Sequence, residues 1–273
     1  LAAQPLGQAG GVGDYLCSAS GQAVACGLPM TTNRILQWTL GLCLLGAFSS
    51  QAADKIKTAK GDLIINPVKH GTVVFQWDGK TVFVDPVGGA APFKKFGTPD
   101  VVLVTDIHGD HFNKDTLTAV VKEKTVVIAP EAVAALAPAG LKKSITTLAN
   151  GKSVEKAGIK VEAVPMYNLT PTRLRFHNKG RGNGYVMTFG GKRVYVSGDT
   201  EDIPEMRALK KIDVAFVCMN LPYTMTPEQA ADAVREFKPK TVYPYHYRGS
   251  DTAKFKKLVG DASEVSLRDW YGK

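Results

Sequence analysis

Short apolar runs separated by turn residues recur along the chain, and their spacing predicts strands that alternate with helices. Two pairs of β-rich runs are joined by dipeptides typical of tight hairpins, Asp78-Gly79 and Gly190-Gly191. The predicted strands are residues 72–77, 80–85, 101–105, 125–129, a pair within 152–164, 184–189, 192–197, 213–218 and 241–245, and the predicted helices are 114–124, 131–137, 227–237 and 252–259. Thr226 and Pro227 supply the N-cap and the first position of the third helix. No repeat or low-complexity stretch divides this part, which predicts one α/β domain over residues 54–273.

The predicted strand at 101–105 leads directly into a cluster of possible metal ligands. Its apolar run ends in Thr105-Asp106-Ile107-His108-Gly109-Asp110-His111, which holds two imidazoles and two carboxylates. Buried without partners, each of these side chains would cost on the order of several kcal/mol. Imidazole and carboxylate together suit a hydrolytic divalent ion such as zinc, manganese or iron. The alternative is a solvated loop in which His and Asp residues occur by chance.

Other predicted strands also end in ligand-type residues. Asp199 follows the strand at 192–197, and His246 follows the strand at 241–245. In layered α/β folds, strand ends deliver their loops to one edge of the sheet. These residues, distant in sequence, can therefore meet at one point.

Residues 30–53 have the three-part pattern of a secretory signal peptide. A short basic stretch comes first, residues 35–48 are almost wholly apolar, and small residues follow where a signal peptidase would cut, near Ala52 or Ala53. The apolar run is shorter than the ~20 residues that span a bilayer, so we expect no membrane span after cleavage and a periplasmic or secreted protein. Residues 1–29 are expected to be an upstream segment that takes no part in the fold.

Charge and cysteine content narrow the function classes. The chain has 34 Lys and Arg against 25 Asp and Glu, a net charge of +9. The lysines are scattered without interleaved aromatic residues, which favours a solvated basic surface over a specific nucleic-acid site and leaves attraction of an anionic substrate open. Of the four cysteines, only Cys218 follows the predicted cleavage point, so neither a disulfide framework nor a cysteine-based zinc site is expected.

Spaced motifs along residues 62–273 resemble the metallo-β-lactamase superfamily. In chain order they are Val68-Lys69-His70-Gly71, Val84-Asp85-Pro86, the cluster at 105–111, Ser197-Gly198-Asp199-Thr200 and Pro244-Tyr245-His246-Tyr247. Within the superfamily, the chain is similar to the compact hydrolases that include the L-ascorbate-6-phosphate lactonase type. The resemblance implies a four-layer αβ/βα sandwich with two metals in a cleft at one edge. For this chain we expect one or two divalent metal ions, zinc, manganese or iron.

The resemblance also implies which residues hold the metals. Asp106 and His108 would serve one metal, Asp110, His111 and His246 would serve the other, and Asp199 would bridge the two. The superfamily motif is normally His-x-His-x-Asp-His, and Asp106 stands where its first His belongs. A carboxylate there hardens the first site and adds negative charge, which favours manganese, iron or magnesium over zinc.

One ligand that the resemblance implies is missing. The superfamily has a His after the strand that ends here near Val164, but this chain continues Pro165-Met166-Tyr167-Asn168. His177 lies further along and can fold back to supply the imidazole; the alternatives are a surface His or a His that contacts substrate. Asn168 is a weaker candidate for the same position.

For three more residues the sequence leaves two possible roles each. His70 matches an early His of the superfamily and is expected beside the cleft, as a catalytic substrate contact or as a structural His. Asp85 is expected to support a ligand side chain, with a plain turn as the alternative. Arg248 is a surface residue or a contact for an anionic substrate group. The segment 180–184 resembles a flexible loop and lacks the context of a phosphate-binding loop.

These patterns predict an exported metal-dependent hydrolase that attacks an ester or lactone bond of a small molecule with a metal-bound hydroxide. Asp110 would orient the hydroxide, with His246 and His70 completing the catalytic residues. The nearest alternative is a phosphodiesterase or nuclease of the same fold, which the basic charge favours. A non-catalytic metal- or ligand-binding protein is the alternative from another class, because Asp106 and the missing His indicate a degenerate site.

Overall fold

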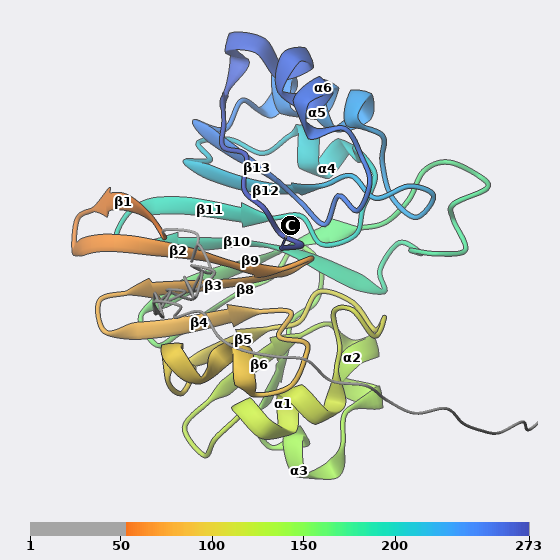
Figure 1. The fold of residues 1–273 in the computed structure, drawn as a ribbon. Coiled ribbons are helices and arrows are strands. Elements are labelled where there is room, and N and C mark those ends of the chain that lie inside the picture. The colour runs from red at the N-terminus through yellow and green to blue at the C-terminus, as the bar shows by residue number, and fades with distance from the viewer. Residues whose placement is uncertain (1–52, 273) are drawn as a thin grey trace, which may run out of the picture. The chain divides into compact units, whose positions relative to one another are not determined.

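Two seven-stranded mixed sheets lie face to face, and helices cover the outer face of each (Figure 1). The computed structural model describes residues 53–272. The predicted upstream segment 1–29 and the predicted signal segment 30–53, apart from Ala53, lie outside the described residues. No helix within residues 53–272 is long and apolar enough to cross a membrane.

In chain order, each sheet starts with antiparallel strands and continues with parallel ones. The first sheet holds, in spatial order, β1 (Asp54–Thr58), β2 (Gly61–Lys69), β3 (Thr72–Trp77), β4 (Lys80–Val84), β5 (Val101–Leu103), β6 (Val126–Ala129) and β7 (Ile145–Thr147). The second holds β14 (Glu264–Val265), β13 (Thr241–Tyr245), β12 (Val214–Cys218), β11 (Lys192–Val196), β10 (Gly182–Phe189), β9 (Ile159–Met166) and β8 (Ser153–Lys156). Strands β4 to β7 are mutually parallel, and so are β11 to β14.

The helices form the two outer layers. On the first sheet they are the 3-10 helix η1 (Ala91–Phe96), α1 (Lys114–Val120), α2 (Glu131–Leu136) and α3 (Ala139–Lys142); on the second they are α4 (Pro204–Arg207), α5 (Pro227–Phe237), α6 (Thr252–Val259) and the 3-10 helix η2 (Gly260–Ala262). Helix α5 begins with a capping box: the Thr226 hydroxyl accepts from the Gln229 backbone N–H, and the Gln229 side chain accepts from the Thr226 N–H.

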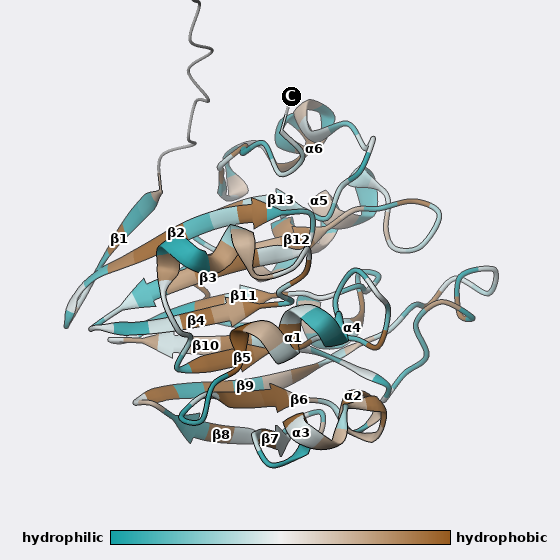
Figure 2. Cartoon of the chain, turned by 60° about the horizontal axis from the view of Figure 1, so that its bottom comes forward, coloured by the Kyte–Doolittle hydropathy of each residue, from teal (hydrophilic) through white to brown (hydrophobic). Residues whose placement is uncertain are grey.

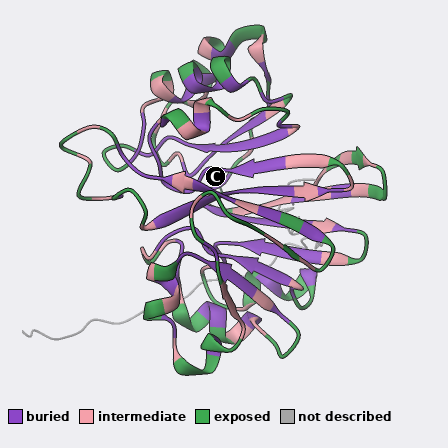
Figure 3. Cartoon of the chain, turned by 180° about the vertical axis from the view of Figure 1, so that it is seen from behind, coloured by how far each residue is buried: buried purple, intermediate pink, exposed green. Residues whose placement is uncertain are grey.

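Apolar side chains fill the space between the sheets and the space under the helices. Between the sheets, the ring of Phe75 on β3 lies 5.7 Å from that of Phe189 on β10 and 5.6 Å from that of Phe216 on β12. Under the helices of the first sheet, Phe83 packs on Phe93 at 4.9 Å. Burying each such ring contributes roughly 1.5–3 kcal/mol. The central strands are accordingly hydrophobic in Figure 2 and buried in Figure 3, where exposed surface gathers on helices and loops.

The parallel strands position the polar residues that matter for function. Strands β4, β5, β11, β12 and β13 are each followed within a few residues by a polar side chain: in that order, Asp85, Asp106, Asp199, Asn220 and His246. All five are buried. The parallel halves of both sheets therefore deliver polar groups to one edge, as their alignment requires.

The predicted four-layer αβ/βα sandwich is confirmed. Strands 72–77 and 241–245 and helices 227–237 and 252–259 have the predicted bounds, whereas the helix predicted at 114–124 ends at Val120. The hairpin of β1 and β2 was not predicted, because its apolar residues alternate with Lys, Asp and Asn and give a weak signal.

The flexible loop predicted at 180–184 is wrong from Gly182 onward. Gly182 opens β10, and both it and Gly184 are buried. A Cβ atom at Gly184 would lie 2.8 Å from the carbonyl oxygen of Ser197, and one at Gly182 would lie 2.9 Å from that of Thr105. Glycine is needed here because neighbouring backbones approach closely, and the segment is fixed in the sheet.

Candidate metal centre

The ligand-type residues predicted from sequence meet at the shared edge of the two sheets. They form three groups, two of which share His246, and within each group the donor atoms lie within 4.8 Å of one another: His70, Asp110 and His246; Asp106, His108 and His177; His111, Asp199 and His246. His177, which lies far from the other motifs in sequence, belongs to the second group.

Asp199 lies at the centre of these groups. Its Oδ2 atom is 3.4 Å from Nε2 of His111 and 3.4 Å from Nε2 of His177, and its Oδ1 atom is 3.4 Å from Nε2 of His246. Nε2 of His246 also lies 3.3 Å from Oδ2 of Asp110. Donor atoms at about 2.1 Å from a tetrahedral ion lie roughly 3.4 Å apart. The observed spacing is therefore that of atoms that share a metal ion.

His111 is held in place by Asp85. The Asp85 carboxylate lies 2.8 Å from His111 Nδ1 and accepts hydrogen bonds from the backbone N–H and the hydroxyl of Thr105 at 2.8 and 2.6 Å. With its Nδ1 hydrogen on Asp85, His111 turns the lone pair of Nε2 toward Asp199. The contact is the one expected of a residue that supports a ligand, and it replaces the plain-turn alternative for Asp85.

The electrostatic field at His111 favours a cation. Burial opposes protonation of the ring, but the carboxylates of Asp199 and Asp85 outweigh it and hold the pKa of His111 well above its ordinary value. Burial likewise opposes ionisation of Asp199, yet the imidazoles of His246 and His111 keep its pKa well below the usual range. Two carboxylates around one buried imidazole attract a proton or, in its place, a divalent ion.

The donor set fits a divalent ion by a second observation. Within residues 53–272, Nε2 of His111, Nε2 of His177 and Oδ1 of Asp199 are buried without a hydrogen-bond partner. Such atoms are rare in folded proteins because each loses its hydration without replacement. Gly71 leaves room for the rings: a Cβ there would lie 3.1 Å from Cδ2 of His246 and 3.4 Å from Cε1 of His111. Divalent ions bound by these side chains would satisfy all three orphaned atoms.

The loop between β9 and β10 brings His177 back to the centre. Nδ1 of His177 donates to the Tyr223 carbonyl oxygen at 3.2 Å, which leaves the Nε2 lone pair directed at Asp199. Asn168, the weaker sequence candidate, donates from Nδ2 to the carbonyl oxygens of Arg173 at 3.0 Å and Tyr223 at 2.7 Å. Asn168 therefore braces the loop that carries His177.

Glu201 holds the same loop in place, and its role was not predicted from the sequence. Its buried carboxylate accepts from the backbone N–H groups of Leu169 and Thr170 and from Nη1 of Arg173, each at 2.6 Å. Burial opposes its ionisation, but these hydrogen bonds keep the pKa of Glu201 below its ordinary value. Its place two residues after Asp199 was the available signal, since a carboxylate so close to a buried strand end needs donors.

Arg181 pairs with Asp106, which changes the expected role of that carboxylate. Nε and Nη2 of Arg181 donate to Oδ1 and Oδ2 of Asp106, and His108 Nδ1 lies 2.8 Å from Oδ2. Burial would raise the pKa of Asp106, but His108 and Arg181 lower it to about 2. The Arg181 guanidinium offsets the negative charge that the Asp106 carboxylate was expected to add to the first site.

His70 and Asp110 form a hydrogen-bonded pair at the pocket surface. Tyr271 Oη accepts from the Arg248 backbone N–H at 2.8 Å, so its own hydrogen is free to reach His70 Nδ1 at 2.7 Å. His70 Nε2 then carries a hydrogen and donates to Oδ2 of Asp110 at 3.1 Å. Burial opposes ionisation of Asp110, but hydrogen bonds from His246 and His70 hold its pKa well below the usual range.

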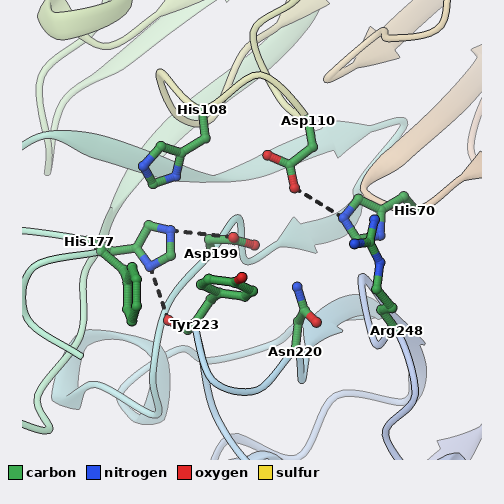
Figure 4. A pocket seen from close by; sticks show the side chains of 9 residues that line it. His70, His108, Asp110, His177, Asp199, Asn220, Tyr223 and Arg248 are labelled. Atoms are coloured by element: carbon green, nitrogen blue, oxygen red, sulfur yellow. Dashed lines mark hydrogen bonds and ion pairs between the residues drawn. The ribbon is translucent and has the colours of Figure 1, made fainter. Parts of the chain in front are cut away.

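These groups line a cavity of about 290 Å³ (Figure 4). Five of its nine lining residues are the ligand-type side chains already described, and the other four are Phe176, Asn220, Tyr223 and Arg248. Carboxylates and imidazoles thus make up about half of the cavity lining, and two aromatic rings, an amide and a guanidinium complete it.

Comparisons with known proteins agree with this geometry. A family model described as Beta-lactamase superfamily domain matches residues 64–246. The chain is 32% identical over 212 residues to a UPF0173 metal-dependent hydrolase of Thermococcus onnurineus, covering 72% of this chain and 93% of the relative. A UPF0173 metal-dependent hydrolase of Symbiobacterium thermophilum is 34% identical over 202 residues, covering 70% and 85%.

Solved structures show the same fold. A proposed metal-dependent hydrolase of Parabacteroides distasonis superposes with a TM-score of 0.73 at 41% identity, covering 79% of this chain and 97% of that one. Igni18, a metallo hydrolase of Ignicoccus hospitalis, superposes with a TM-score of 0.63 at 20% identity, covering 76% and 95%. At that lower identity the likeness concerns the fold alone.

Proposed function

Because this chain belongs to the β-lactamase superfamily and to its UPF0173 metal-dependent hydrolases, we propose that it hydrolyses an ester or lactone bond in a small molecule. We further propose that two divalent ions support the reaction, with Asp199 between them. The observation that carries the proposal is the position of Asp199 Oδ2, which lies 3.4 Å from Nε2 of His111 and 3.4 Å from Nε2 of His177.

The donor set divides into two halves. His111, His246, Asp110 and Asp199 would hold one ion, and His108, His177 and Asp199 would hold the other, with Asp106 beside them. A divalent ion bound there lowers the pKa of water and polarises the bond under attack. Because each half offers two imidazoles and Arg181 neutralises Asp106, zinc remains as suitable as manganese or iron.

Asp110 is the residue proposed to orient the attacking water. Its carboxylate is partly exposed to the cavity, while His70 fixes Oδ2 through a hydrogen bond of 3.1 Å. Its depressed pKa keeps it ionised at neutral pH, so that it accepts a hydrogen bond from water and aligns it. His70 acts on Asp110 by donating from Nε2 and so keeps the carboxylate in one rotamer.

The size of the cavity supports a small substrate. About 290 Å³ lies at the lower end of the range for small-molecule sites, roughly 300–1,000 Å³. A nucleic-acid strand needs a longer groove with aromatic or basic platforms. The family and the complete donor set also favour catalysis over the alternative of a binding protein with a degenerate site.

A substrate screen tests the proposal. Protein loaded with zinc, manganese or iron(II) is assayed on γ-butyrolactone, p-nitrophenyl acetate and bis(p-nitrophenyl) phosphate. We expect turnover of the lactone or ester that falls at least roughly a hundredfold in Asp110→Asn. Asp115→Asn, an exposed carboxylate in the first turn of α1, is the matched control and should retain activity. Turnover of the phosphodiester alone would replace the ester or lactone assignment by the phosphodiesterase alternative.

A further inference from the structure

Asn220 presents an unpartnered amide to the cavity. The residue is only 5% exposed, and its backbone is held in a turn in which its carbonyl oxygen accepts from the N–H groups of Tyr223 and Thr224, both at 2.9 Å. Within residues 53–272, the side-chain amide of Asn220 makes no hydrogen bond, although it lines the cavity. A buried amide that is directed into a cavity is expected to bind a ligand. A buried polar group without a hydrogen-bond partner costs more free energy than a polar group exposed to water.

Arg248 lines the same part of the cavity and carries an unused charge. Its guanidinium has neither an ion pair nor a hydrogen bond in the described part of the chain, and it is the one Lys or Arg among the lining residues. Figure 4 shows Arg248 and Asn220 on the side of the pocket near His70, away from His108 and His177. The cavity therefore has a cationic side away from the half-site of His108 and His177.

The backbones that carry these two side chains are tied together. Ser250 donates from its hydroxyl to the carbonyl oxygen of Met219, the residue before Asn220. The backbone N–H of Arg248 donates to the Tyr271 hydroxyl at 2.8 Å, and the Ser250 N–H donates to the Tyr247 carbonyl at 2.7 Å. The loop after β13 is thus fixed to the loop after β12, and the backbones that carry the amide and the guanidinium are held in place in advance of any ligand.

We infer that Arg248 and Asn220 form a subsite for an anionic oxyacid group of the substrate, a carboxylate or a phosphate. A guanidinium pairs with two oxygens of such a group at once, and an amide N–H can donate to a third position. The inference rests on the proposed function, because it places the scissile bond over Asp110 and Asp199. The substrate class is then a small ester or lactone that bears a negative charge beside the reacting bond.

The opposite wall defines what the rest of the substrate can be. The rings of Phe176 and Tyr223 pack edge to face with centroids 5.0 Å apart, and the Tyr223 carbonyl oxygen lies 3.2 Å from Nδ1 of His177. They offer an apolar surface without a charged group. A substrate that spans the cavity would place its anionic end at Arg248 and a short apolar end against these rings.

Binding of three probes tests the subsite without turnover. Glutarate, 3-phosphonopropanoate and glutaramate share a carboxylate that can face the metal half-sites and differ at the far end, which is a carboxylate, a phosphonate or a neutral amide. Affinities are measured by calorimetry on the metal-loaded protein, on Arg248→Gln and on Asn220→Ala. Lys257→Gln, an exposed lysine in the last turn of α6, is the control for loss of a positive charge.

We expect the wild type to bind glutarate or the phosphonate roughly ten- to a hundredfold more tightly than glutaramate, the range typical of a charge-assisted pair. In Arg248→Gln this preference should vanish, in Asn220→Ala it should fall by less, and in Lys257→Gln it should persist. The better of the two anionic probes identifies the oxyacid. Equal binding of glutarate and glutaramate by the wild type, or an unchanged preference in Arg248→Gln, would overturn the inference.

Kinetics separate this inference from the proposed function. If monomethyl glutarate is hydrolysed and dimethyl glutarate is not, Arg248→Gln should raise KM for the former with a smaller change in kcat. If neither ester nor any lactone is hydrolysed while the charge preference in binding persists, the proposed reaction fails and the anion subsite stands. Hydrolysis of both esters with equal kcat/KM, unaffected by Arg248→Gln, overturns the subsite and leaves the hydrolase.

Discussion

The guanidinium of Arg181 donates two parallel hydrogen bonds to the carboxylate of Asp106, from Nε to Oδ1 at 3.0 Å and from Nη2 to Oδ2 at 2.9 Å. The Asp106 side chain is fully buried, so neither charge is tolerable there without the other. Arg181 also donates to the Phe176 carbonyl and thereby anchors the residue next to His177. The pair explains how the centre accommodates a carboxylate where the superfamily motif has an imidazole.

Arg181→Gln should destabilise the protein and weaken the half-site of His108 and His177. Removing one partner of a buried ion pair leaves the other charge unpaired and costs about 3 kcal/mol. Arg181→Lys should recover little of this, because an ammonium cannot form the two parallel bonds. Urea unfolding gives the free-energy change, and Arg181→Gln combined with Asp106→Asn should be more stable than Arg181→Gln alone. Equal stability of the single and double variants would show that the pair is not coupled.

Gly71→Ala should reduce metal retention, because the added methyl group would lie 3.1 Å from the ring of His246 and 3.4 Å from that of His111. The rings must shift by a few tenths of an ångström, and metal affinity is sensitive to ligand position. Gly109→Ala is the matched control, since no atom lies within 4 Å of a Cβ there. Competition with a chelator measures both. Retention of metal by Gly71→Ala at the level of Gly109→Ala would contradict the crowding argument.

Tyr271→Phe should act on Asp110 through His70. Without the hydroxyl, only the Asp110 carboxylate favours the hydrogen of His70 on Nε2, and the donor to Asp110 is lost in part of the molecules. We expect kcat to fall roughly tenfold while stability changes by about 1 kcal/mol or less. Nitrogen NMR of the His70 ring reports the tautomer directly. Tyr247→Phe, which removes a hydroxyl that donates to the Arg268 carbonyl, should leave the His70 spectrum unchanged.

Asp213 should make the stability of the protein depend on acidic pH. Burial opposes its ionisation, but the Lys240 ammonium and the Arg193 backbone N–H outweigh it and lower the pKa of Asp213. A depressed carboxyl pKa stabilises the folded state above the ordinary pKa near 4 and loses that contribution as pH falls below it. The difference in unfolding free energy between wild type and Asp213→Asn should therefore be constant near neutral pH and shrink below about pH 4. A difference that stays constant from pH 6 to pH 3 would contradict this assignment.

Sequence patterns predicted the architecture and most of the ligand-type residues because both depend on local order. The prediction that Asp106, Asp199 and His246 meet required only that the ends of parallel strands share an edge of the sheet, and they do. His177 was open between ligand and surface His. Its position depends on Glu201 and Asn168, which hold a loop folded back across the centre, and such contacts leave no periodic signal in the sequence.

The residues that sequence reasoning missed act through long-range pairs. Tyr271 meets His70 across 201 positions, and Arg181 meets Asp106 across 75. The Asp106 substitution did carry a usable signal, because a buried carboxylate requires a compensating cation. It did not indicate which arginine supplies it. Asn220 follows an apolar strand as Asp199 and His246 do, but an amide alone does not distinguish a ligand contact from a turn residue.

Metal content tests the central claim most directly. Wild-type protein, His177→Ala and His111→Ala are purified without chelator from metal-supplemented cells and analysed by elemental mass spectrometry. The account predicts about two divalent ions per wild-type chain and about one in His177→Ala, with His111→Ala also depleted, because each half-site depends on its imidazole. A wild-type protein without divalent metal, or a metal content that neither substitution changes, would contradict the assignment of this centre.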